Sequence, residues 1–233
     1  MRRTIGVIGG LGPVATLDFF ARVLKATPAA VDQDHIRLII DNNPTVPERN
    51  AGIAGTGPSP APALAKMARG LERAGADVLV MPCNAAHAFE ADIRAATSLP
   101  FISLIEVTAD AVAAVAPDAK RAGLLAVQGT ISSGVYHKSL AARGVEVIAP
   151  EGEAMERLMA AIRRVKQGDT GAETRAAMEA CAAELVALGA DVLIAGCTEV
   201  PVVLDPDDVS VPLVSSTDVL VERTVAVAFG AAL

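Results

Sequence analysis

The chain has 233 residues, of which 52% are hydrophobic, and its formal net charge is −7. With five Phe, one Tyr and no Trp, a core of this size must be aliphatic. The acidic balance argues against nucleic acid as a partner, because no basic stripe offers contacts to phosphates. No run of about 18 apolar residues occurs, so no membrane partner is expected. Three cysteines, an odd number, argue against a disulfide framework and favour a reducing cytoplasm.

Short aliphatic segments alternate with amphipathic ones along the chain. Segments bounded by Gly, Pro, Asn or Asp are predicted strands, and apolar residues at helical spacing predict the helices. In chain order we predict strand 4–10, helix 14–26, strand 36–42, helix 61–74, strand 76–82, helix 86–96, strand 100–104, helix 106–116, strand 122–127, helix 134–143, strand 145–150, helices 153–167 and 172–188, strands 190–196 and 211–216, and helix 217–231. This alternation predicts an α/β fold with parallel sheets covered on both faces.

The pattern repeats within the chain. The segment LERAGADVLVMPCN (71–84) matches LVALGADVLIAGCT (185–198), 114 residues later. LPFISLIE (99–106) likewise resembles VPLVSSTD (211–218). Two similar α/β halves are the simplest interpretation, with the crossover between them near residue 105.

Two of the cysteines, Cys83 and Cys197, occupy equivalent positions in this repeat. Both follow predicted strands, at the carboxyl ends where parallel α/β sheets bind ligands. Asn84 and Thr198 come next and can cap a helix, whose N-terminus would lower the pKa of each thiol toward neutrality. Two such thiols in a cleft between the halves suit stereoinversion. One removes a proton from a carbon, and the other returns a proton to the opposite face.

Simpler interpretations of the cysteines stay open. A cysteine at a strand end is often a small buried hydrophobe. A disulfide would need Cα atoms within about 7 Å, which conflicts with a cleft that admits a ligand. Cys181 is an internal control: it shares one face of the predicted helix 172–188 with Met178, Leu185 and Leu188, and is expected to be structural.

Several motifs together resemble the aspartate/glutamate racemase superfamily, and within it the aspartate racemase branch. They are GVIGGLGPVAT (6–16), IIDNNPTVPERN (39–50), PCNAAH (82–87), GLLAVQGT (123–130), VKQGD (165–169) and AGCTEVP (195–201). The resemblance implies two pseudo-symmetric flavodoxin-like α/β domains with parallel sheets and the active site in the interdomain cleft. It implies domains of 1–104 plus 212–233 and of 105–211, and a homodimer. It also implies a cofactor-independent enzyme without a metal, in which Cys83 and Cys197 are the opposed acid and base.

The remaining site residues are predicted to hold an amino-acid substrate. The backbone amides of Asn84, Ala85, Ala86, Thr198 and Glu199 are candidates for the α-carboxylate, where negative charge develops. Glu199 can also hold the ammonium or orient Cys197, or be a solvated loop acid. His87 is expected to have a supporting role at most.

A second carboxylate on the substrate would require a local cation. Arg49 can grip a carboxylate with two parallel hydrogen bonds, whereas a lysine at a helix end, as Lys166 is, often only complements the dipole. The resemblance implies that Arg49 and Lys166 clamp the side-chain carboxylate, and it adds Leu11 and Thr130 to the substrate contacts. The chain departs from the family pattern at Leu11, Ala85 and Ser215, where Met, Thr and Asp are usual.

Other functions are weighed against this one. GLGPVA (10–15) fits a dinucleotide-binding fingerprint, but Asp41 lies too far on to be its acidic partner, and a dehydrogenase would leave the paired cysteines unexplained. Hydantoin racemase, maleate isomerase and thiol-dependent decarboxylase chemistries share the superfamily. Ala85 also keeps open a non-catalytic amino-acid-binding descendant. The prediction is a racemase that interconverts L- and D-aspartate, with glutamate as the next candidate.

Overall fold

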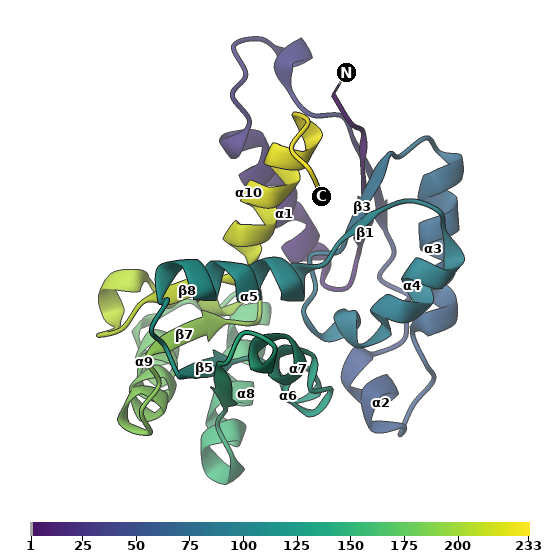
Figure 1. Ribbon diagram of the computed structural model, residues 1–233. Helices are drawn as coiled ribbons and strands as arrows, with labels where there is room; N and C mark the ends of the chain where they lie inside the picture. Colours follow the sequence, from purple (N-terminus) through teal and green to yellow (C-terminus); the bar gives the residue numbers. More distant parts are fainter. Residues whose placement is uncertain (1) are drawn as a thin grey trace. The chain divides into compact units, whose positions relative to one another are not determined.

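The computed structural model describes residues 2–233 and has two four-stranded sheets in that range (Figure 1). The strand orders are β2-β1-β3-β4 and β6-β5-β7-β8, and the strand pairings are parallel. The two sheets therefore have the same connectivity, which follows the order of flavodoxin-like folds. The predicted α/β class with two flavodoxin-like halves is confirmed.

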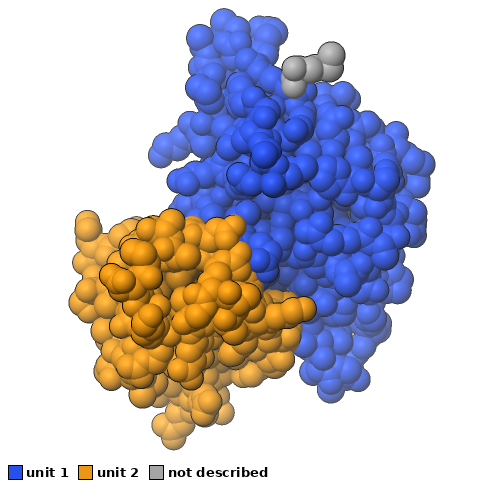
Figure 2. All heavy atoms as spheres, viewed as in Figure 1, with its two compact units in different colours: residues 1–107, 217–233 blue, residues 108–216 orange. Residues whose placement is uncertain are grey.

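The chain divides into two compact units (Figure 2). Unit 1 is residues 1–107 with 217–233, and unit 2 is residues 108–216. The chain passes from one unit to the other within α5 (Leu104–Val115) and returns at the start of α10 (Ser216–Ala228). The predicted division into domains of 1–104 plus 212–233 and of 105–211 stays a prediction.

Unit 1 is built around the first sheet, with α1 and α10 on one face and α3 and α4 on the other (Figure 1). A cluster of buried aliphatic residues, including Leu64, Leu71, Leu79 and Ile93, fills the second of these faces. The elements are β1 (Ile5–Gly9), α1 (Pro13–Ala26), η1 (Asp32–Asp34), β2 (Leu38–Asn42), α2 (Arg49–Ala54), α3 (Ala61–Arg73), β3 (Val78–Val80), η2 (Ala85–Phe89), α4 (Glu90–Ala96) and β4 (Phe101–Ile102).

Unit 2 repeats this plan around the second sheet. Its central strands are buried apart from Arg121 at the start of β5, as expected for strands covered on both faces. The elements are β5 (Arg121–Leu125), α6 (Gln128–Ser132), α7 (Val135–Ala141), β6 (Glu146–Ile148), α8 (Gly152–Lys166), α9 (Ala172–Ala187), β7 (Val192–Ala195), η3 (Val200–Val202), η4 (Pro206–Asp208) and β8 (Leu213–Ser215).

The internal repeat extends to side-chain packing around one glycine in each unit. A Cβ added to Gly6 would lie 2.7 Å from Leu79 Cδ2 and 2.8 Å from Ala76 Cβ. A Cβ added to Gly123 would lie 2.6 Å from Leu193 Cδ2 and 3.1 Å from Ala190 Cβ. Each central strand therefore needs glycine, because the leucine and alanine of the repeated GADVL segment pack directly against its backbone.

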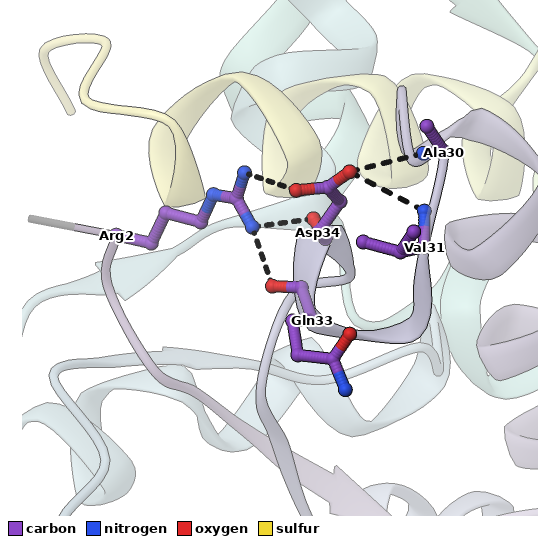
Figure 3. Close-up of polar contacts among 5 residues, drawn as sticks. All are labelled: Arg2, Ala30, Val31, Gln33 and Asp34. Atoms are coloured by element: carbon purple, nitrogen blue, oxygen red, sulfur yellow. Dashed lines mark hydrogen bonds and ion pairs between the residues drawn. The ribbon is translucent and has the colours of Figure 1, made fainter.

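The N-terminal segment is held to unit 1 by Arg2 (Figure 3). Its guanidinium donates to the carbonyl oxygens of Gln33 and Asp34, at 3.0 and 2.6 Å, and lies 4.8 Å from the centre of the Phe229 ring. The Asp34 carboxylate accepts from the backbone N–H groups of Ala30 and Val31. These bonds, with that of Ala30 the largest contribution, lower the pKa of Asp34. The segment 30–34, which precedes β2, is therefore held by Arg2 and by the hydrogen bonds of the Asp34 carboxylate.

The predicted strands and long helices are present, and three local predictions are wrong. The helix predicted from residue 86 begins as the 3-10 turn η2, and α4 starts only at Glu90. No helix is predicted between residues 43 and 60, but Arg49 is the first residue of α2, which Glu48 caps by accepting from Ala51 N–H. Leu188 is exposed rather than buried with Cys181, because α9 ends at Ala187 and Gly189, with φ 91°, turns the chain.

Candidate active site

Each cysteine of interest lies at the switch point of its own sheet. In unit 1, β1 is flanked by β2 and β3, and Cys83 follows β3. In unit 2, β5 is flanked by β6 and β7, and Cys197 follows β7. The crevice beyond the carboxyl ends of two such strands is where open α/β sheets bind ligands. Both sheets therefore present a thiol at the position that their topology favours for a ligand.

In unit 1 the backbone carbonyl of Leu11 brings Cys83 and Arg49 together. The Cys83 thiol lies 3.8 Å from Leu11 O, and Arg49 Nη2 donates to the same oxygen at 3.0 Å. Arg49 Nη1 also donates to the carbonyl oxygens of Val46 and Pro47. The glycine loop after β1 thus positions a thiol and a guanidinium side by side.

The residues after Cys83 form a tight buried turn. Asn84, Ala85 and Ala86 are buried, and His87 N–H donates to Asn84 O at 3.0 Å, which closes a 3-10 turn. Asn84 stands at the N-cap position but makes no side-chain cap bond, so its predicted capping function is wrong. His87 is a satisfied buried histidine whose ring contacts the Cys83 carbonyl and the backbone of Leu104.

In unit 2 Cys197 is held by Glu199. The Cys197 thiol donates to Glu199 Oε2 at 2.9 Å, and Thr198 Oγ1 donates to the same oxygen at 3.0 Å. Glu199 thus contacts both residues, and its predicted function, to hold the ammonium or to orient Cys197, stays a prediction. Thr198 uses its hydroxyl for this carboxylate rather than as a helix cap, and the following η3 is a single 3-10 turn, Val200–Val202.

The expected low thiol pKa is wrong for Cys197. The residue is only 8% exposed, and burial raises the pKa of its thiol well above the usual value. The Glu199 carboxylate raises this pKa further, through its charge and through the hydrogen bond, while the Lys166 ammonium lowers it. The predicted helix N-terminus is a short turn, so it does not outweigh desolvation.

The family model described as Asp/Glu/hydantoin racemase matches residues 8–224. The chain belongs to this racemase family. The protein is therefore an isomerase, an amino-acid racemase of the Asp/Glu type.

Individual relatives agree with this assignment. The broad specificity amino-acid racemase RacX of Bacillus subtilis (strain 168) is 31% identical over 227 residues, which span 95% of this chain and 96% of that protein. The structure of Picrophilus torridus aspartate racemase has a TM-score of 0.85 at 29% identity, covering 97% of this chain and 94% of its own. Glutamate racemase isoform RacE1 of Bacillus anthracis shares the fold, with a TM-score of 0.69 at 22% identity over 98% and 83% of the two chains.

The remaining predicted residues of the racemase have distinct environments. Lys166 is the exposed last residue of α8, and its charge acts on Cys197. Thr130 is fully buried in α6, and among the described residues its hydroxyl has no hydrogen-bond partner. An unpartnered buried hydroxyl is costly, which is consistent with a position reserved for a ligand. Ser215 ends β8, beside Ala195 of β7.

Tyr136, which no sequence motif singled out, lies near enough to Cys197 for the charge of that thiolate to affect it. Its phenol is fully buried and hydrogen-bonds to the side chains of Thr108 and Ser216. Burial raises the pKa of the phenol, and the nearby Cys197 raises it further. The only signal in the sequence was that this residue is the single Tyr of the chain.

The described part of the chain contains no cluster of three His, Cys, Asp or Glu that would hold a metal ion. All three cysteines of the racemase are thiols rather than disulfides. Within residues 2–233, no helix has the length and apolar character needed to cross a membrane.

Proposed function

We propose that this racemase interconverts L- and D-aspartate without a cofactor, with Cys83 and Cys197 as the acid and base. The observation that carries the proposal is the pair of thiols at the equivalent switch points of two sheets with one strand order. A racemase must act on both faces of the same carbon, and two thiols supplied by two related units meet that need. Glutamate is the second candidate substrate.

In the proposed reaction, one thiolate removes the α-proton while the opposed thiol delivers its own proton to the other face. The Cα–H bond breaks, a new Cα–H bond forms, and the two sulfurs exchange protonation states. Cys197 is the acid in the direction in which Cys83 is the base, because its raised pKa and its bond to Glu199 favour the protonated thiol. In the reverse direction the Cys197 thiolate removes the α-proton and the Cys83 thiol delivers its own proton to the other face, which restores the first protonation state.

The substrate contacts follow from donors near the two thiols. Backbone amides of the turns at Asn84–Ala86 and Thr198–Glu199 would bind the α-carboxylate, where charge develops in the transition state. Arg49 would bind a side-chain carboxylate with guanidinium donors besides those given to Leu11, Val46 and Pro47. Lys166 would complete this clamp, and the Thr130 hydroxyl would donate to the substrate.

Racemisation in deuterium oxide tests the proposal. Incubation with L-aspartate, without added cofactor, is expected to yield D-aspartate that carries α-deuterium, as measured by chiral chromatography and mass spectrometry. Cys83→Ala and Cys197→Ala should each abolish the exchange of configuration, because each removes one of the two proton carriers. Cys181→Ala, the matched control on the buried face of α9, should leave the rate unchanged.

The substrate panel separates the alternatives. Glutamate, neutral amino acids and a substituted hydantoin are included, because the relatives comprise a broad specificity racemase and the family includes hydantoin racemases. Inactivity toward every amino acid of the panel would refute the proposed reaction. Racemisation that survives in Cys197→Ala would refute the two-thiol mechanism alone.

The homodimer and the cytoplasmic location belong to the same proposal. The odd number of cysteines argues against a disulfide framework and so supports a reducing compartment. The proposed dimer is supported by the exposed apolar residues Val14, Leu17 and Leu24 of helix α1.

A further inference from the structure

His87 joins the Cys83 turn to the start of α5. Its Nδ1 lies 2.8 Å from the carbonyl oxygen of Cys83, and its Nε2 lies 3.1 Å from the backbone nitrogen of Leu104. The ring is buried, with its centre 5.6 Å from that of Phe101. One side chain therefore connects the loop that carries a proposed catalytic sulfur to the first residue of the helix that leaves unit 1.

The two partners of the ring determine where its proton lies. A carbonyl oxygen can only accept, so Nδ1 must carry a hydrogen, and a backbone N–H can only donate, so Nε2 must be bare. Protonation of Nε2 would place two donors against each other at 3.1 Å. The Leu104 N–H is also one of the helix N-terminal donors that no intrahelical carbonyl can satisfy, and neutral His87 accepts from it.

The surrounding charges agree with a neutral ring. Burial lowers the pKa of His87, and Arg94 lowers it too, whereas Glu90 and the bond to the Cys83 carbonyl raise it. Glu90 is occupied by Arg94 and by Ser103 Oγ, at 2.7 Å each. The Glu90–Ser103 bond is a second tie between the segment after Cys83 and the residue that precedes α5.

We propose that His87 is a positioning residue, a neutral bridge that holds the Cys83 turn against the first turn of α5 and so fixes the direction of the Cys83 thiol. It does not itself exchange protons with the substrate. The expected effect on catalysis rests on the proposed function. The hydrogen bonds of His87 and its effect on the position of Cys83 do not depend on that function.

Kinetics of two variants test the bridge. His87→Ala removes both bonds and is expected to lower kcat for aspartate by about 10²-fold with little change in KM, because a thiol displaced by about 1 Å loses alignment with the α-carbon. His87→Gln keeps one donor and one acceptor on a planar amide and should recover most of this loss. Equal losses in the two variants, or a wild-type kcat in His87→Ala, would overturn the proposal.

Two measurements do not depend on racemase activity. Nitrogen-15 NMR of the wild-type protein between pH 6 and 8 should show His87 as the neutral Nδ1–H form, and a protonated Nε2 would overturn the bridge. Alkylation of Cys83 by iodoacetamide, followed by mass spectrometry of its peptide, should change at least several-fold in His87→Ala and return toward wild type in His87→Gln. An unchanged rate in His87→Ala would overturn the placement of Cys83. These results decide the inference even if the protein racemises no substrate.

The bridge also predicts a pH dependence of stability. The pKa of His87 is lowered from 6.5 in the folded state, so below about pH 6.5 the unfolded chain binds more protons than the folded one. The contribution of neutral His87 is therefore complete above that pH and is lost as the pH falls toward the folded-state pKa. Urea unfolding of wild type and His87→Gln at pH 5 to 8 should show this loss in the wild type and not in the variant. Parallel curves would overturn the inference.

Discussion

At the residue scale, the pKa of the Cys197 thiol depends on burial and on two charged residues, Glu199 and Lys166, that shift it in opposite directions. Burial is the largest influence on its pKa, and the carboxylate of Glu199 adds to it, while the ammonium of Lys166 acts in the opposite direction. Burial and Glu199 thus favour the protonated thiol, whereas Lys166 favours the thiolate. The same two side chains that the sequence analysis assigned to substrate binding therefore also control the proposed acid.

Removing these charges one at a time should move the thiol pKa in opposite directions. In Glu199→Gln the pKa of Cys197 is expected to fall, because a negative charge and its hydrogen bond are lost, and in Lys166→Met it should rise. The measurement is the pH dependence of iodoacetamide alkylation at Cys197, read by peptide mass spectrometry.

Cys181 is the internal control in the same samples. Its own pKa is raised by burial and by Glu184, and it lies outside the contacts of Glu199, so its alkylation profile should not move. A Cys197 profile that is unchanged in both variants would contradict the electrostatic account.

At the element scale, the repeat determines which strands tolerate a side chain. Gly6 in β1 and Gly123 in β5 meet the same pair of side chains from the repeated GADVL segments. Each strand is central in its sheet, so the surroundings have little room to move. The repeat of the glycine and of the GADVL segment in both halves is therefore explained by packing, independently of the thiols.

Gly6→Ala and Gly123→Ala should each lower the free energy of unfolding by about 1–3 kcal/mol, as overpacking in a dense core does. Gly70→Ala is the matched control. It lies inside α3, where the described residues leave open space for a Cβ, so it should raise the free energy of unfolding by about 0.5–1 kcal/mol. Chemical denaturation followed by circular dichroism measures all three. A neutral Gly6→Ala would show that β1 can shift away from Leu79.

Local element boundaries were harder to predict than element types. The turn after Cys83 is closed by bonds from the His87 backbone and ring, and these take the place of a regular helix start. Helix α2 depends on its Glu48 cap and on Arg49 reaching the glycine loop, 38 residues away in sequence. Periodicity within a window of the sequence carries no information about such partners.

At the scale of the whole molecule, helix α1 carries apolar residues on two opposite faces. Phe19 and Val23 are buried in unit 1, while Val14, Leu17 and Leu24 are 77%, 66% and 38% exposed. These exposed residues, with exposed Ala21, are spaced by three, four and three residues, the pattern of a helix-packing seam. The seam would complement the same seam of a second copy around a twofold axis, which supports the proposed homodimer.

The double variant Leu17→Glu with Leu24→Glu should shift the protein from dimer to monomer, because it would bury carboxylates in the proposed contact. Sedimentation velocity at several protein concentrations measures this shift. Leu188→Glu, at an exposed leucine outside the seam, is the control and should remain dimeric. A wild-type protein that sediments as a monomer, or a seam variant that stays a dimer, would refute this interface.

The sequence by itself determined the class of fold, the repeat, the strand ends that carry Cys83 and Cys197, and the family. These features depend on periodicity and on motifs, which are local properties of the chain. Only the tertiary structure decided that burial and Glu199 raise the pKa of Cys197, that Leu11 joins Cys83 to Arg49, and that His87 reaches Leu104. Desolvation and hydrogen-bond partners depend on which distant segments pack together, and no local pattern specifies that packing.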